Sequence, residues 1–122
     1  MKRFIIITAL LLTAAQADAA FYGSDYLKRL LDSCNALPET FDASPENFDK
    51  VKDCGLSTGY ILGVFDSLDV LADRSMCFPG TVQSEQVVDA VDTWLKNHPE
   101  RIHQAASKSV SQAIVETWSC AR

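Results

Sequence analysis

Four cysteines, two histidines and a row of aspartates are the side chains in this 122-residue sequence whose types could carry chemistry. The cysteines are Cys34, Cys54, Cys77 and Cys120. Their spacings of 20, 23 and 43 residues contain no Cys-x-x-Cys and match no zinc ribbon or finger. An even number of cysteines is typical of disulfide bonds when a chain enters an oxidising compartment. Two disulfides are therefore the expected chemistry, and no metal site is predicted.

The two histidines do not form a known catalytic or metal-binding pair. His98 and His103 lie on either side of Pro99, so they do not repeat the i, i+4 spacing of a zinc-binding His-Glu-x-x-His. A cysteine and a histidine could form a nucleophilic pair, but two disulfides would use every thiol. The sequence contains no nucleophile elbow, phosphate-binding loop or dinucleotide fingerprint. These observations predict a binding or structural protein without a cofactor, rather than an enzyme.

Asp66, Asp69 and Asp73 form an acidic row with the i, i+3, i+7 spacing of one helix face. A solvated face is the simplest interpretation, and a docking surface for a basic partner is the functional alternative. Catalysis by paired carboxylates would need a second group in a different environment opposite them. The sequence supplies no such group.

Small residues at every fourth position form a stripe along the same predicted helix. The members of this small-residue stripe are Gly55, Gly59, Gly63 and Ser67. Another backbone can approach such a stripe closely because no large side chain stands in the way. One interpretation is packing within the chain against a second stripe of small residues, at Ala105, Ser109 and Ala113. The other interpretation is the seam of a homodimer.

The first nineteen residues have the pattern of a secretory signal peptide, in which two basic residues precede an apolar run. Small residues at Ala17 and Ala19 suit a signal peptidase, so cleavage is expected after Ala19, with Ala17 or Ala20 as alternatives. The apolar run of about a dozen residues is too short to span a membrane, which needs roughly 20. Residues 1–19 are thus predicted to be removed, with a retained anchor as the alternative. Residues 20–122 are expected to form one exported domain without a membrane segment.

This exported domain would be acidic. The full sequence holds 11 basic and 16 acidic residues, and the leader contains Lys2, Arg3 and Asp18, so 9 basic and 15 acidic residues remain. The surplus of negative charge repels nucleic-acid phosphates and anionic lipid, so neither is an expected partner. A basic protein is the more natural complement.

Apolar periodicity predicts four helices and no clear strand, which indicates an all-α fold. The helices are expected at residues 24–36, 44–73, 84–98 and 99–119. Ser24 and Ser44 are the predicted N-caps of the first two helices, and Gly55 could bend the second. In the third helix, Asp89 and Asp92 are expected to point away from the buried stripe.

This layout favours one of the three disulfide pairings that four cysteines allow. The third and fourth helices have similar lengths and run out and back, which should return Cys120 to the loop that holds Cys77. Cys34, at the end of the first helix, should lie near Cys54, early in the second. The favoured bonds are Cys34–Cys54 and Cys77–Cys120, worth roughly 3 and 4 kcal/mol in the chain-entropy model.

Four segments and the last cysteine carry a family resemblance. They are FYGSDYLKRLLDSC at 21–34, GYILGVFD at 59–66, CFPGTVQSEQV at 77–87, WLKNHPERIHQAA at 94–106, and Cys120. Together they resemble the Rap/Tai family of periplasmic immunity proteins, which act against amidase effectors of type VI secretion. One departure is Gln83, which stands where the family has threonine, so Ser84 is expected to take over the cap of the third helix.

The resemblance implies an all-helical, usually dimeric periplasmic protein that holds a peptidoglycan amidase inactive. The expected contact surface combines the loop at residues 75–82 with the acidic row. Its members are Asp66, Asp69, Asp73, Ser75, Met76 and Phe78. The alternative is a periplasmic acid-stress chaperone of the HdeA type, since those proteins are also small, helical, disulfide-bonded dimers.

Overall fold

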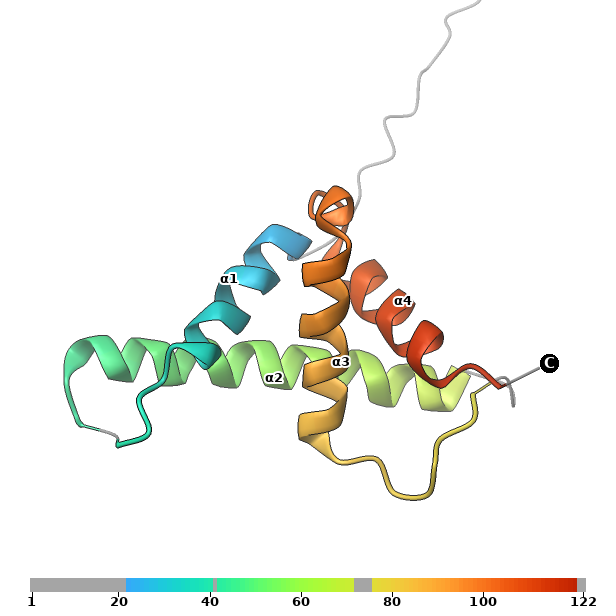
Figure 1. The fold of residues 1–122 in the computed structure, drawn as a ribbon, viewed down its shortest axis with the longest axis horizontal. Coiled ribbons are helices and arrows are strands. Elements are labelled where there is room, and N and C mark those ends of the chain that lie inside the picture. The colour runs from blue at the N-terminus through green and yellow to red at the C-terminus, as the bar shows by residue number, and fades with distance from the viewer. Residues whose placement is uncertain (1–21, 41, 72–75, 121–122) are drawn as a thin grey trace, which may run out of the picture.

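The computed structural model describes residues 22–40, 42–71 and 76–120, except for the side chains of residues 69–71. The described residues form α1 (Ser24–Asn35), α2 (Pro45–Leu71), α3 (Ser84–Asn97), a short 3-10 turn η1 (Pro99–Arg101) and α4 (Ala106–Trp118), as Figure 1 shows. No strand is formed within these ranges. The expected all-α, four-helix, disulfide-bonded fold is confirmed. The expected leader at residues 1–19 lies outside the described residues.

The long helix α2 supports the other three helices. It runs along the length of the molecule in Figure 1, and α1, α3 and α4 all pack against it. Helices α3 and α4 also pack against each other. The short helices therefore share one side of α2, and the core lies where they converge.

The core residues recur along each helix at the spacing that places them on one face. They are Leu27 and Leu31 of α1, Ile61 of α2, Val87, Val91, Trp94 and Leu95 of α3, and Ala106, Val110, Ala113, Ile114 and Trp118 of α4. Burying one such large side chain stabilises the fold by roughly 1.5–3 kcal/mol. Val88, which the periodicity places in this stripe, packs against the core but is only partly buried.

The start of α2 follows the expected capping pattern. The Ser44 hydroxyl accepts a hydrogen bond from the Asn47 backbone N–H at 3.3 Å, and Pro45 occupies the first helical position. Asp42 adds a second acceptor, because its Oδ1 atom receives the Asn47 amide at 2.6 Å. Hydrogen bonds from Ser44 and Asn47 hold the pKa of Asp42 below its ordinary value. The helix then continues through Gly55 without a break.

The predicted caps of α1 and α3 are each displaced by one residue. Gly23, not Ser24, is the N-cap of α1. Ser24 is instead the first residue of the helix, and its side chain is fully buried. At α3 the cap is Gln83 rather than Ser84, because the Gln83 backbone N–H donates to the Gln86 side chain at 2.9 Å. A reciprocal capping arrangement therefore replaces the serine hydroxyl that the sequence suggested.

The fourth helix begins later than expected. Pro99 starts only the turn η1, and α4 begins at Ala106. The reason is a long-range pairing, in which Ser24 N–H donates to the Gln104 carbonyl at 2.9 Å and Ala106 N–H donates to the Tyr22 carbonyl at 2.9 Å. Because Gln104 and Ala106 pair with the chain at the start of α1, the helical path is interrupted between η1 and α4.

Asp92 does not point away from the protein as expected. Its side chain is only 13 % exposed and ion-pairs with Lys96 at 2.6 Å. The Oδ2 atom also accepts a bond from the Asn35 amide at 3.2 Å, which ties α3 to the end of α1. The bond to Asp92 raises the pKa of Lys96, with a smaller contribution from Asp89.

Two disulfides join the pairs that the helix layout favoured. Cys34–Cys54 links the last turn of α1 to α2, and Cys77–Cys120 links the loop after α2 to the residue that follows Ser119. Beside the second bond, the Cys77 backbone N–H donates to the Trp118 carbonyl at 2.8 Å. The loop between α2 and α3 is thus fastened to the end of α4 by both a covalent bond and a backbone hydrogen bond.

A buried hydroxyl pair joins α1 to α4 and supports a double-mutant test. The Ser24 and Ser109 hydroxyl oxygens are 2.7 Å apart, and Gln104 donates to Ser109 at 2.7 Å. Ser109→Ala leaves buried polar groups without a partner and should cost roughly 1–3 kcal/mol in urea unfolding. The Ser24→Ala, Ser109→Ala double variant should lose about 1 kcal/mol less than the sum of the single variants. Additive losses would contradict this coupling.

Candidate partner-binding surface

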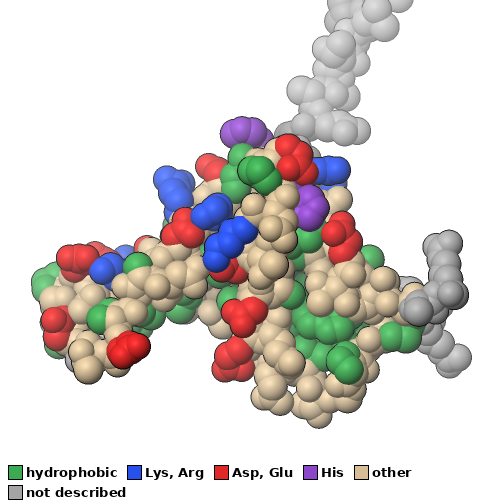
Figure 2. All heavy atoms as spheres, in the orientation of Figure 1, with side chains coloured by type: hydrophobic (Ala, Val, Ile, Leu, Met, Phe, Trp, Pro, Cys, Tyr) green, Lys and Arg blue, Asp and Glu red, His purple; other side chains and the backbone are tan. Residues whose placement is uncertain are grey.

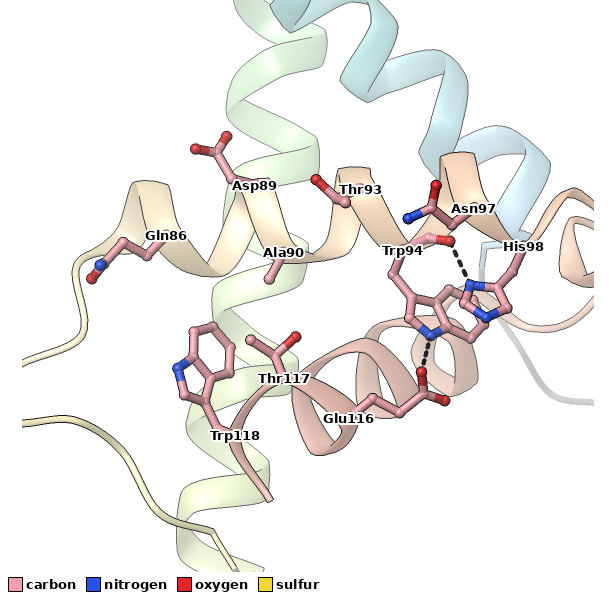
Figure 3. A pocket seen from close by; sticks show the side chains of 10 residues that line it. All are labelled: Gln86, Asp89, Ala90, Thr93, Trp94, Asn97, His98, Glu116, Thr117 and Trp118. Carbon is pink, nitrogen blue, oxygen red and sulfur yellow. Dashed lines mark hydrogen bonds between the residues drawn. The ribbon is translucent and has the colours of Figure 1, made fainter. Parts of the chain in front are cut away.

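A groove of about 650 Å³ with polar groups around it runs between α3 and α4. We call it the α3–α4 groove. It is lined by Gln86, Asp89, Ala90, Thr93, Trp94, Asn97, His98, Glu116, Thr117 and Trp118. Figure 3 shows the Ala90 and Trp94 side chains on the side of α3 that faces α4, with Glu116, Thr117 and Trp118 opposite them. The groove therefore has one edge on each helix.

At the end of the groove near η1, three side chains contact one another in series. The Trp94 indole N–H donates to Glu116 Oε2 at 2.8 Å. The His98 ring stacks on the Trp94 indole, with ring centres 4.2 Å apart and planes inclined by 20°. The His98 Nδ1 atom lies 2.8 Å from the Trp94 carbonyl oxygen, which places the ring proton on Nδ1 because a carbonyl only accepts. These contacts fix the position of the Glu116 carboxylate.

The other end of the groove meets an aromatic cluster. The Trp118 ring lies 6.1 Å from the Phe65 ring and 5.8 Å from the Phe78 ring, and the two phenylalanine rings are 5.2 Å apart. Figure 2 shows hydrophobic side chains gathered between the end of α4 and the loop that joins α2 to α3. Through Phe78 and Trp118, this loop is continuous with the α3–α4 groove.

The structure describes half of the residues that were predicted to contact a partner. Phe78 is partly buried in the aromatic cluster, and Met76 is partly buried and pairs through its backbone with Ser119. Asp66 is exposed on α2. Asp73 and Ser75 lie outside the described residues, as does the side chain of Asp69. The loop residues are thus placed beside the groove, and the acidic row as a whole is not described.

The small-residue stripe of α2 does not pack against α4, which corrects the first interpretation of it. Gly55, Gly59, Gly63 and Ser67 are all exposed. A Cβ atom added at any of the three glycines would meet no atom within 4 Å. The small residues of α4 turn inward instead, since Ser109 and Ala113 are fully buried in the core. The second interpretation, a homodimer seam, stays a prediction.

The exposed stripe borders a second groove of about 520 Å³ between α2 and α4. Three large apolar side chains of α2 extend this surface, with Phe48 66 %, Val51 42 % and Leu56 44 % exposed. At about 100° per residue, all three fall on the same side of α2 as the glycines. One face of α2 therefore offers glycines and uncovered apolar side chains together.

The two histidines are placed apart from each other in the structure. Within the described part of the chain, no three His, Cys, Asp or Glu side chains are grouped so that they could hold a metal ion. Of these histidines, His103 is exposed and His98 is the ring stacked on Trp94. None of the described helices is sufficiently long and apolar to cross a bilayer.

Sequence reasoning missed the α3–α4 groove. The i, i+4 spacing of Trp94 and His98 could have indicated their stacking, because such residues are neighbours on a helix. The bond from Trp94 to Glu116 crosses to another helix, and no local pattern predicts it. The position of Glu116 depends on how α3 and α4 pack.

A known protein family matches most of this chain. The model of a family described as Rap1a immunity proteins matches residues 27–120 of this chain. The matched range includes the four cysteines, nearly all of the four helices and both edges of the α3–α4 groove. No curated protein matches the chain.

Proposed function

Because this chain belongs to the Rap1a immunity protein family, we propose that it binds and blocks a peptidoglycan amidase effector of type VI secretion. The match over residues 27–120 is the observation that carries this proposal. Its binding would protect the producing cell from attack by sibling cells. The protein itself would act by occupying a surface of the effector and not by catalysis.

Two features of the fold suit this role. Two disulfides and a continuous core hold the helices rigidly, and a preorganised surface loses little conformational entropy when it binds. The loop at residues 76–82, fastened by Cys77–Cys120, lies beside the α3–α4 groove. We place the effector contact on this loop, the adjoining groove and the acidic row that begins at Asp66.

The site of action in the proposal is the periplasm. Both disulfides need an oxidising compartment, and residues 1–19 have the pattern of an export signal. The amidase substrate, peptidoglycan, would be reached from the same compartment. An immunity protein that stayed in the cytosol could not intercept it there.

We further propose that two copies of the chain pair through the exposed face of α2. Gly55, Gly59 and Gly63 would let two helices approach closely, because a Cβ at these sites would meet no atom of the described residues within 4 Å. Phe48 and Val51 would bury apolar area that is uncovered in a single copy. The loop at residues 76–82 and the α3–α4 groove lie away from this face and remain available to the effector, whereas Asp66 falls on the same side of α2 as the glycines and would border the seam.

The proposal predicts protection that depends on export. A cell that directs the amidase encoded in the same genome to its periplasm should lyse, and co-expression of the full chain should prevent lysis. Deletion of residues 2–19 should abolish protection, because the protein then stays in a compartment without the amidase. Purified chain and amidase should also form a complex at micromolar concentration, and an amidase inactivated at its nucleophile serves as the non-lytic control. Absence of both protection and complex would refute the pairing with that amidase.

A further inference from the structure

The α3–α4 groove combines negative charge with aromatic surface. Its edges carry Asp89 on α3 and Glu116 on α4, and no lysine or arginine lines it. Within the described residues neither carboxylate forms an ion pair. Lys96, whose pKa Asp89 helps to raise, is itself bonded to Asp92 at 2.6 Å. The groove thus has one anionic group between the helices, Glu116, and a second at its rim, because the Asp89 carboxylate points away from α4 in Figure 3.

The carboxylate of Glu116 is held ready for a ligand. Its Oε2 atom receives the Trp94 indole N–H at 2.8 Å, and the His98 ring stacked on the indole restricts its movement. A fixed acceptor costs less entropy on binding than a carboxylate on a freely rotating side chain. Figure 3 shows this side chain directed from α4 toward Trp94, across the space between the two helices.

The aromatic edge adds a second recognition element. Trp118 lines the groove at the end that meets Phe78, and both His98 and Trp94 line the opposite end. Planar guanidinium groups stack on aromatic rings and donate forked hydrogen bonds to carboxylates. An ammonium group would satisfy the charge but would lack the flat stacking surface.

We infer that the α3–α4 groove binds a basic side chain of the partner effector, with arginine as its preferred occupant. This inference rests on the proposed function for its partner, and it adds the chemistry by which that partner is held. The charge complementarity also agrees with the acidic balance of the chain, which has a formal net charge of −5.

The test compares two double variants with the same change in net charge. Glu116→Gln with Asp89→Asn neutralises the groove, and a glutamine oxygen can still accept the Trp94 indole bond. Glu85→Gln with Glu100→Gln neutralises two exposed carboxylates outside the groove. Binding to the cognate amidase is measured as association and dissociation rates at low and high salt.

The groove variant should bind roughly tenfold more weakly or worse, and most of the loss should be faster dissociation. The control variant should change affinity by no more than about twofold, through the association rate, because only long-range attraction is altered. Equal losses in the two variants, or no loss in either, would overturn the inference while leaving the proposed function intact.

A second measurement tests the groove without the effector. N-acetyl-arginine amide is titrated into the full exported chain while the indole N–H resonance of Trp94 is followed by NMR. A saturable shift is expected with this probe, no shift with the neutral N-acetyl-citrulline amide, and no shift in the Glu116→Gln variant. Identical responses to both probes, or no response to N-acetyl-arginine amide, would refute the binding of arginine in the α3–α4 groove. If the probe binds while the amidase does not, the proposed function fails for that amidase and the arginine site remains.

Discussion

Replacing Cys77 and Cys120 with serine is expected to lower the free energy of unfolding by about 4 kcal/mol. The bond closes a loop with a sequence separation of 43 residues, and the chain-entropy model assigns larger stabilisation to longer loops. A loss of this size is a large share of the 5–15 kcal/mol that is typical of folded proteins. Urea unfolding of the oxidised chain and of the variant, followed by circular dichroism, measures the difference.

The matched control is the serine variant of Cys34 and Cys54, whose sequence separation is 20 residues. Its expected cost is about 3 kcal/mol, because the shorter loop loses less entropy when it is closed. The two variants should differ further in their effect on the loop at residues 76–82. Only loss of Cys77–Cys120 removes the covalent link between that loop and the end of α4, and leaves the loop held by the hydrogen bond from Cys77 to Trp118 and by the contact of Phe78 with Trp118. A loss below about 1 kcal/mol for the Cys77 variant would contradict the assigned role of the bond.

Replacing Gly59 and Gly63 with glutamine is expected to dissociate the proposed homodimer while leaving each copy folded. The two side chains would stand where the partner helix must approach, and within one copy they meet open space. Glutamine also has a better helix propensity than glycine, by roughly 0.5 kcal/mol or more at each site. The monomer should therefore become about 1 kcal/mol more stable as the dimer is lost.

Analytical ultracentrifugation over a range of concentrations gives the oligomeric state, and urea unfolding at low concentration gives the monomer stability. The control replaces Glu46 and Lys50 with glutamine on the opposite side of the same helix, where a surface ion pair at 2.7 Å is worth little. This variant should stay dimeric. A wild-type chain that is monomeric at every concentration tested, or a glutamine variant that remains dimeric, would rule out the seam at the glycines.

The helices were predictable from the sequence because local periodicity decides them. Core positions such as Leu27, Leu31, Val87 and Val91 follow a spacing that is visible without any tertiary information. The disulfide pairing followed from the same information, since four helices of known length in a short chain leave few ways to bring Cys34 to Cys54. The all-α fold and its covalent frame were therefore accessible from local patterns.

The predictions that the structure corrects share a different cause. Ser24 is of a residue type that often caps helices, but in this fold its hydroxyl is buried and hydrogen-bonded to the Ser109 hydroxyl of α4. Pro99 can start a helix, but only the turn η1 forms there, and backbone pairing between residues 104–106 and 22–24 delays the start of α4 to Ala106. The glycines of α2 suggested an intrachain contact because spacing reveals a stripe but not which side of the helix the core occupies. In each case a contact between distant parts of the chain outweighed the local preference.

The backbone pairing of Tyr22 and Ser24 with Gln104 and Ala106 also sets an order of events during export. If the chain crosses the membrane from its N-terminus, Tyr22 and Ser24 are translocated early. Their partners, Gln104 and Ala106, follow only after most of the remaining polypeptide has crossed. Their native docking can be completed only after residue 106 has been translocated. Signal peptidase, whose expected cut is after Ala19, would thus act on a start that is still unstructured, three residues before Tyr22. In such an export, Tyr22 and Ser24 would dock in one of the last steps, and a chain halted in transit would leave them accessible to proteases.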